Sequence, residues 1–166
     1  MPIKWKWGRG IPNNLGRKQT RRAFGSAHKT WATLRSNCSN SVRSYVRYRY
    51  KGRARRSPGR DGVNLVDFGR LGSSAIGVTY TWFQNGRMLE SDLRLNSEYR
   101  WTNRRRGRGF RVANVAVHEL GHQLGLGHVG NGHGALSMYS VTYPGETKKM
   151  TLGRGDLRGI ASIYGR

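Results

Sequence analysis

The chain has 166 residues, a length that suits one domain built around one hydrophobic core. Its formal net charge is +23, from 31 Lys and Arg against 8 Asp and Glu, which predicts nonspecific, salt-sensitive binding to nucleic acid, anionic lipid or other polyanions. No apolar run approaches the ~20 residues of a membrane-spanning helix, and the single cysteine, Cys38, which we interpret as small and partly buried, excludes an internal disulfide.

The first part of the chain predicts a strand followed by an amphipathic helix. Residues 3–7 alternate apolar and basic side chains, a pattern typical of a half-exposed strand. Over residues 17–34 the apolar side chains fall at helical spacing, at Ala23, Phe24, Ala27, Trp31 and Leu34. His28 has no acid or second histidine near it in the sequence, so we interpret it as a surface or core-edge residue and not as a metal ligand.

The middle of the chain predicts further strands of a sheet. Val, Tyr and Arg alternate over residues 42–50, which indicates a strand with a strongly basic face, and a basic loop follows it up to residue 62. Three more strands are expected, over residues 63–68, 75–83 and 89–95. Asn85 and Gly86 separate the last two, and this dipeptide is typical of a tight hairpin turn.

The most informative stretch is a predicted helix over residues 110–124. His118 and His122 are four residues apart, so their imidazoles leave the same helix face one turn apart. That is the spacing of two ligands of one zinc ion. Glu119 stands beside the first of them, where a carboxylate could act as a general base on a zinc-bound water.

The chain after this helix offers a third ligand. Gly125 is the expected helix end, because glycine tolerates the left-handed conformation that turns a chain out of a helix. His128, three residues further on, could then return to the metal. Three protein ligands leave a fourth position for water, which is the pattern of catalytic zinc. The competing interpretation is an amphipathic core helix with incidental histidines, and a chance match to this pattern is on the order of one in 10⁵.

The C-terminal part predicts a loop and a closing helix. Residues 129–135 are rich in glycine and contain His133, which we interpret as a loop residue outside the zinc shell. Residues 154–164 predict the closing helix, and Asp156 in its first turn suits the positive end of the helix dipole.

These motifs together resemble a known group of enzymes. Residues 118–128, HELGHQLGLGH, resemble the zinc signature of the metzincin metalloproteases, and within that clan they are most similar to the matrixins. Residues 135–139 follow at the distance of the clan's Met-turn. Residues 152–165 resemble the last helix of matrixin catalytic domains, and residues 77–83 and 90–96 resemble the sheet segments of small microbial members.

The resemblance implies an α+β, zincin-like fold with a twisted mixed sheet of about five strands, three helices and the active-site helix under the sheet. It implies one catalytic domain over residues 1–166, with an N-terminal subdomain over about 1–128 and a C-terminal one over about 129–166. The strand near residues 74–80 would be the exposed edge beside the cleft. Peptide substrate would add to this edge as an antiparallel strand, along Ala75, Ile76 and Gly77.

The resemblance also implies a zinc-dependent endopeptidase that cleaves protein or peptide substrates. The three histidines of the signature would bind one catalytic Zn²⁺, and Glu119 would act as the general base. Met138 would form the hydrophobic base under the metal without binding it. Tyr139 or Tyr143 would line the pocket for the first side chain after the cleaved bond, and the sequence leaves open which one, because it reads Met-Tyr-Ser where matrixins commonly have Met-Tyr-Pro.

Further expectations concern cofactors, location and an alternative function. Calcium is a possible second cofactor with little support, because the loops that correspond to matrixin calcium sites carry Arg and only scattered acids. We expect a monomeric, secreted protein in a processed form, since the N-terminal residues contain no apolar signal region. The alternative is a basic protein on a metzincin scaffold that binds nucleic acid or an anionic surface and in which zinc is only structural.

Overall fold

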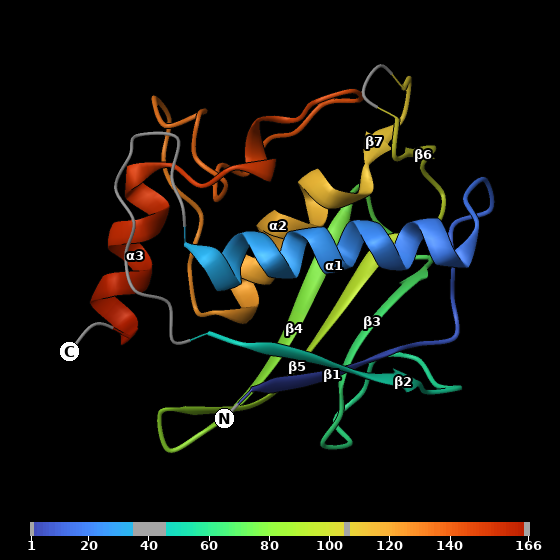
Figure 1. Ribbon diagram of the computed structural model, residues 1–166, viewed down its shortest axis with the longest axis horizontal. Coiled ribbons are helices and arrows are strands. Elements are labelled where there is room, and N and C mark those ends of the chain that lie inside the picture. The colour runs from blue at the N-terminus through green and yellow to red at the C-terminus, as the bar shows by residue number, and fades with distance from the viewer. Residues whose placement is uncertain (1, 35–45, 105–106, 165–166) are drawn as a thin grey trace.

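The computed structural model describes residues 2–34, 46–104 and 107–164, and it shows an α+β fold with a twisted sheet and three α-helices (Figure 1). The main sheet contains β1 (Ile3–Trp7), β2 (Tyr48–Arg53), β3 (Asn64–Gly69), β4 (Gly77–Gln84) and β5 (Arg87–Asn96). The helices are α1 (Arg17–Thr33), α2 (Val112–Gln123) and α3 (Arg154–Tyr164), with a short 3₁₀ helix η1 (Lys148–Met150) before α3. The expected fold class, with five strands and three helices, is confirmed.

The strand order is β2-β1-β3-β5-β4. β1 pairs in parallel with β2 and β3, and β3 pairs in parallel with β5, so the sheet is mixed only because β4 is antiparallel to β5. At the turn between β4 and β5, Asn85 and Gly86 have φ of 50° and 72°, the left-handed values that a tight hairpin turn requires. β4 is the last strand in this order and so lies at an edge of the sheet, where the family resemblance placed the exposed strand.

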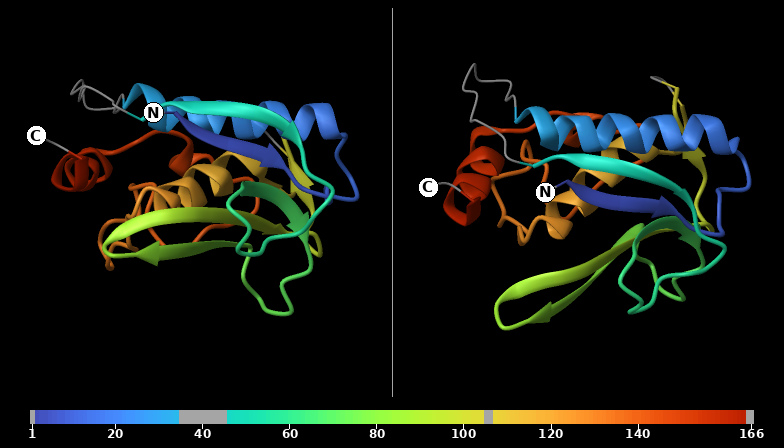
Figure 2. Two further views of the ribbon diagram at one scale, coloured as in Figure 1. Left: turned by 90° about the horizontal axis from the view of Figure 1, so that it is seen from below. Right: turned by 60° about the horizontal axis from the view of Figure 1, so that its bottom comes forward.

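Helices α1 and α2 pack against each other on one side of the sheet, and α2 contacts β4 and β5 (Figure 2). Aromatic side chains fill the space between α1 and the strands. The ring centroids of Trp7 and Phe24 are 5.4 Å apart, and those of Phe68 and Trp101 are 5.2 Å apart. The indole nitrogen of Trp31 on α1 donates a hydrogen bond of 2.8 Å to the carbonyl of Val117 on α2. Helix α2 is thus fixed by a large aromatic core and by a direct hydrogen bond from α1.

Most element boundaries differ from the sequence prediction by one or two residues, and β2 differs most. The basic strand expected over residues 42–50 begins at Tyr48 and runs to Arg53, and residues 35–45, including Cys38, lie outside the described part of the chain. β2 is an edge strand whose arginines face solvent, so its charge pattern does not determine where the strand begins and ends. Those bounds are set by its pairing with β1. The helix expected from residue 110 begins at Val112, because Phe110–Arg111 forms the short strand β7 with β6 (Trp101–Thr102).

His28 is a core residue in the structure, with 4% of its surface exposed. Its ring stacks on Trp5 at 4.5 Å and meets Tyr48 at 4.4 Å, and its Nδ1 lies 2.8 Å from the carbonyl oxygen of Phe24. Burial lowers the pKa of His28 to about 4, so the ring is neutral at neutral pH.

Among the described residues, no helix is both long enough and apolar enough to span a bilayer.

Candidate active site

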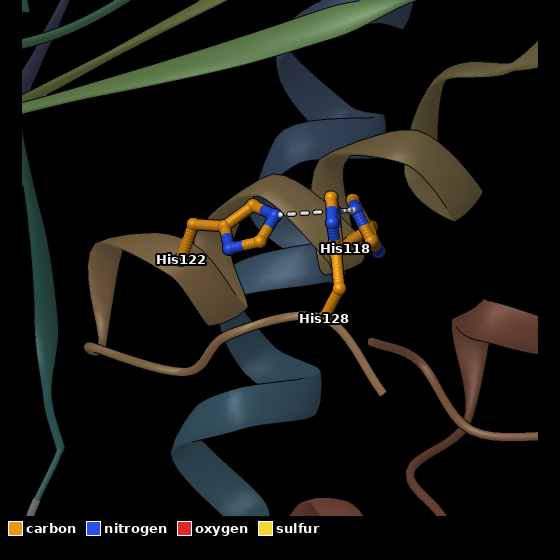
Figure 3. A group of neighbouring side chains, drawn as sticks. All are labelled: His118, His122 and His128. Atoms are coloured by element: carbon orange, nitrogen blue, oxygen red, sulfur yellow. Dashed lines mark hydrogen bonds between the residues drawn. The ribbon is translucent and has the colours of Figure 1, made fainter. Parts of the chain in front are cut away.

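The three histidines of the signature meet at one point (Figure 3). Helix α2 ends at Gln123, and Gly125 with φ of 89° turns the chain so that His128 returns over the helix. The Nε2 atom of His128 lies 3.1 Å from Nε2 of His118 and 3.1 Å from Nε2 of His122. The spacing read from the sequence therefore brings all three predicted ligands together.

Backbone carbonyls orient the two helical imidazoles. Nδ1 of His118 lies 2.7 Å from the carbonyl oxygen of Ser137, and Nδ1 of His122 lies 2.7 Å from that of Leu126. A carbonyl only accepts, so Nδ1 carries the proton in both rings and each Nε2 keeps its lone pair. Burial lowers the pKa of His118 to about 3 and also lowers the pKa of His122, which keeps both rings neutral.

This donor set fits a zinc ion. Neutral Nε2 lone pairs that face each other at 3.1 Å repel unless a cation lies between them. Nitrogen ligands at ~2.0–2.1 Å from a tetrahedral zinc ion are about 3.3 Å apart, close to the spacing found here. In the part of the chain that the structure describes, this is the one group of three or more His, Cys, Asp or Glu side chains that could hold a metal.

Glu119 lies beside the histidines with its carboxyl group buried. Its Oε2 accepts a hydrogen bond of 2.7 Å from the hydroxyl of Thr79 on β4. Burial raises the pKa of Glu119 to about 7, and the hydrogen bond from Thr79 opposes this shift. A side chain at Gly77 would start 2.7 Å from Oε1 of Glu119, so the glycine lets β4 pass close to the carboxylate. A carboxyl group with a pKa near neutrality is suited to accept and return a proton.

Met138 lies under α2, with 2% of its surface exposed. The adjoining backbone is held by Asp156 of α3, whose carboxylate accepts hydrogen bonds from the amides of Gly153 at 2.7 Å, Ser137 at 3.0 Å and Met138 at 3.4 Å. Asp156 therefore fixes the backbone of residues 137–138, which we call the Met138 segment, as well as the start of α3. The carbonyl of Ser137 in turn contacts His118, so Ser137 connects the Asp156 carboxylate to the histidine site.

Gly121 allows α2 to lie directly on Met138. A Cβ at Gly121 would overlap the Met138 sulfur and come within 3.0 Å of the Trp31 ring. We expect Gly121→Ala to destabilise the protein by about 1–3 kcal/mol, because α2 must move away from the Met138 and Trp31 side chains. Urea denaturation of the zinc-loaded protein measures this loss.

The matched control is Gly25→Ala on α1, where a Cβ has no neighbour within 4 Å. Alanine is a better helix former than glycine, so this change should stabilise the protein by up to about 1 kcal/mol. Equal shifts in both variants would show that contact with Met138 does not restrict position 121.

A cleft of about 660 Å³ lies between β4 and α2. Ala75, Ile76 and Gly77, the predicted substrate edge, line one side of it, and the zinc-site histidines and Glu119 line the other. Neither of the predicted pocket tyrosines is among the lining residues described: Tyr139 is half-buried, and Tyr143 is 67% exposed. Polar side chains occupy that part of the lining, namely Ser140, Thr142 and Lys149.

Two acids of β5, Glu90 and Asp92, accept hydrogen bonds from backbone amides. Glu90 accepts hydrogen bonds from the amides of Asp61 and Gly62, and Asp92 accepts them from Gly59 at 2.8 Å and Leu65 at 2.7 Å. Burial raises the pKa of Asp92 to about 6. These carboxylates close the loop before β3 with amide donors, in a region where the sequence left calcium open.

Several residues that build the site have no motif of their own. Thr79 binds Glu119 across 40 positions of sequence, and Ser137 contacts His118 across 19. No local pattern distinguishes this threonine or this serine from others in the chain. The contacts arise only when β4 and the Met138 segment fold onto α2.

Comparison with known proteins adds an independent line of support. A family model described as matrixin matches residues 73–165, which is more than half of the chain. Human matrix metalloproteinase-27 is 38% identical over 90 residues, covering 54% of this chain and 17% of that protein. Human neutrophil collagenase is 37% identical over 89 residues (54% and 18%), and human matrilysin is 32% identical over 84 residues (51% and 30%).

The matched region contains the edge strand, the whole histidine site and the closing helix. The chain spans less than a third of the length of each of these three relatives. The agreement of sequence, fold and metal-site geometry identifies the group: the chain belongs to the matrixin family of metalloendopeptidases.

Proposed function

We propose that this chain is a zinc-dependent endopeptidase that hydrolyses peptide bonds with Glu119 as general base. The observation that carries the proposal is the convergence of three Nε2 atoms, with His128 3.1 Å from each of the other two, beside the buried carboxyl group of Glu119. Zinc held by His118, His122 and His128 would polarise the scissile carbonyl and acidify a water molecule. A site built only to hold zinc has no need of a buried carboxyl group beside its ligands.

Glu119 is placed to handle the proton. Its carboxylate accepts a proton from the attacking water and then delivers it to the leaving amine, so one group serves as base and as acid. The hydroxyl of Thr79 holds the carboxylate in one orientation throughout. Met138 supports the helix that carries Glu119 and is not itself a ligand.

The edge of the sheet suggests how substrate binds. Among the described strands, β4 pairs only with β5, which leaves its other edge for an extended peptide to add through backbone hydrogen bonds. Ala75, Ile76 and Gly77 would align that peptide along the cleft, beside Glu119. We infer that protein or peptide chains are the substrates, that the enzyme acts as a monomer, and that it acts outside the cell.

The test is zinc titration of the metal-free chain, with hydrolysis of a mixed protein substrate as the readout. We expect no cleavage without zinc, cleavage that rises up to one equivalent of zinc, and loss of cleavage on adding a chelator. The binding should also raise the midpoint of thermal unfolding, because zinc binds the folded site preferentially. One bound zinc ion per chain with no cleavage of any protein or peptide would reject the enzymatic function.

A further inference from the structure

The positive charge of this chain is placed away from the proposed catalytic site. The chain contains 31 Lys and Arg, yet none of them lies between positions 112 and 147, the stretch with the active-site helix and the Met138 segment. Lys149 is the one basic residue described in the lining of the peptide cleft, and it is buried and bonded to Glu146 at 3.0 Å. The basic surface therefore belongs to another part of the molecule.

A second hollow gathers much of this charge. It has a volume of about 1230 Å³ and lies between the N-terminal half of α1, the β6 and β7 strands and the start of α2. Its lining residues include the five arginines Arg22, Arg100, Arg104, Arg108 and Arg111, against one acid, Glu98. It shares no described lining residue with the peptide cleft.

The arginines of this hollow have no anionic partner among the described residues. The ion pairs of the described chain involve Arg56, Arg70, Arg94 and Lys149, and Glu98 is the partner of Arg70 at 3.7 Å. The Nε atom of Arg111 is buried without a hydrogen-bond partner. Arg111 also stands at the N-cap position of α2, where the helix dipole adds positive potential. An anion in the hollow would offset the repulsion among these guanidinium groups.

The positive field extends beyond the hollow along α1. This helix has 17 residues and contains no acid. Lys18, Arg22 and Lys29 lie on the side away from the core, whereas the guanidinium of Arg21 lies over the Tyr50 ring of β2 at 5.2 Å. Seventeen helical residues span about 25 Å, and cations four residues apart stand about 5–6 Å apart at Cβ. A small anion would contact only the hollow, whereas a polymer with a charge on every unit would contact both the hollow and the basic residues along α1.

We propose that this hollow and the exposed side of α1 form a docking site for nucleic acid. A phosphodiester strand carries one charge per nucleotide, and the guanidinium fork matches phosphate oxygens in a bidentate manner. Of the two aromatic residues in the lining, Trp101 is only 1% exposed, and Tyr99 is half-buried with its ring centroid 5.2 Å from that of Phe110. Binding is therefore expected mainly through the phosphates, with little sequence preference. The site adds nucleic-acid binding to the chain independently of peptide hydrolysis.

The experiment measures binding of a fluorescent 20-nucleotide single-stranded DNA to the zinc-loaded full chain at several salt concentrations. The test variant carries Arg100→Gln, Arg104→Gln and Arg108→Gln, three exposed positions in the hollow. The control carries Arg49→Gln, Arg53→Gln and Arg60→Gln, which are also exposed but do not line the hollow. Both variants lose the same charge.

We expect the test variant to lose about 10- to 30-fold in affinity and its salt slope to fall by about 2–3, roughly one per lost phosphate contact. The control should change less than about threefold. Hydrolysis of a short uncharged peptide should be unchanged in the test variant, which shows that the variant is folded. Equal losses in both variants would reject a defined site in favour of diffuse charge. Tighter binding of a sulfated glycan or of poly-glutamate through the same arginines would reject nucleic acid as the ligand.

Discussion

Replacement of Glu119 by Gln should lower the rate of peptide hydrolysis by about 10²–10⁴-fold, the usual contribution of a positioned general base, while one zinc ion stays bound. Glutamine has the same shape and its carbonyl oxygen can still accept the hydrogen bond from Thr79, which is 2.7 Å long in the native site. It cannot take a proton from water at neutral pH. The loss should therefore appear in kcat, measured on a fluorogenic peptide with zinc content determined in the same samples.

The stability of this variant separates chemistry from folding. Glu119 is 5% exposed, and burial already raises the pKa of its carboxyl group to about 7. A neutral amide avoids the cost of a buried charge, so we expect Glu119→Gln to unfold at the same or a higher temperature than the native chain. A variant with zinc bound, an unchanged fold and an undiminished kcat would remove Glu119 from the mechanism.

The parts of the site that follow from one helix and one turn were predictable. His118 and His122 follow from the helical period, and Gly125 supplies the left-handed turn that returns His128. The hairpin turn was predictable for the same reason, because Asn85 and the next glycine adopt a conformation that few other residues tolerate. In each case a backbone requirement is written in the local sequence.

The parts that depend on packing between distant segments were not predictable. Thr79 and Ser137 are ordinary residues until β4 and the Met138 segment reach α2. The boundaries of β2 and α2 shifted for the same reason, since strand pairing overrode a pattern of charges and of apolar residues. The sequence predicted a basic protein but could not show that five arginines line one hollow away from the peptide cleft.

Replacement of Asp156 by Ala should destabilise the protein by about 2–5 kcal/mol. The buried carboxylate accepts hydrogen bonds from the amides of Gly153, Ser137 and Met138, so truncation leaves three buried or half-buried donors without a partner. Chemical denaturation of the metal-free protein measures this loss. Asp156→Asn should be less severe, because one oxygen remains to accept while the amide group opposes the other donors.

The same change should weaken zinc binding by about 10- to 100-fold, although Asp156 does not contact the metal site. Its carboxylate fixes the backbone at Ser137, and the Ser137 carbonyl holds Nδ1 of His118 at 2.7 Å. Glu98→Ala is the matched control, since Glu98 is an exposed acid whose pair with Arg70 at 3.7 Å is worth no more than about 1 kcal/mol. Equal zinc affinity in the two variants would show that the orientation of His118 does not depend on α3. A selective loss in Asp156→Ala would show that a residue of the closing helix, 38 positions after His118 in the sequence, sets the geometry of the metal site.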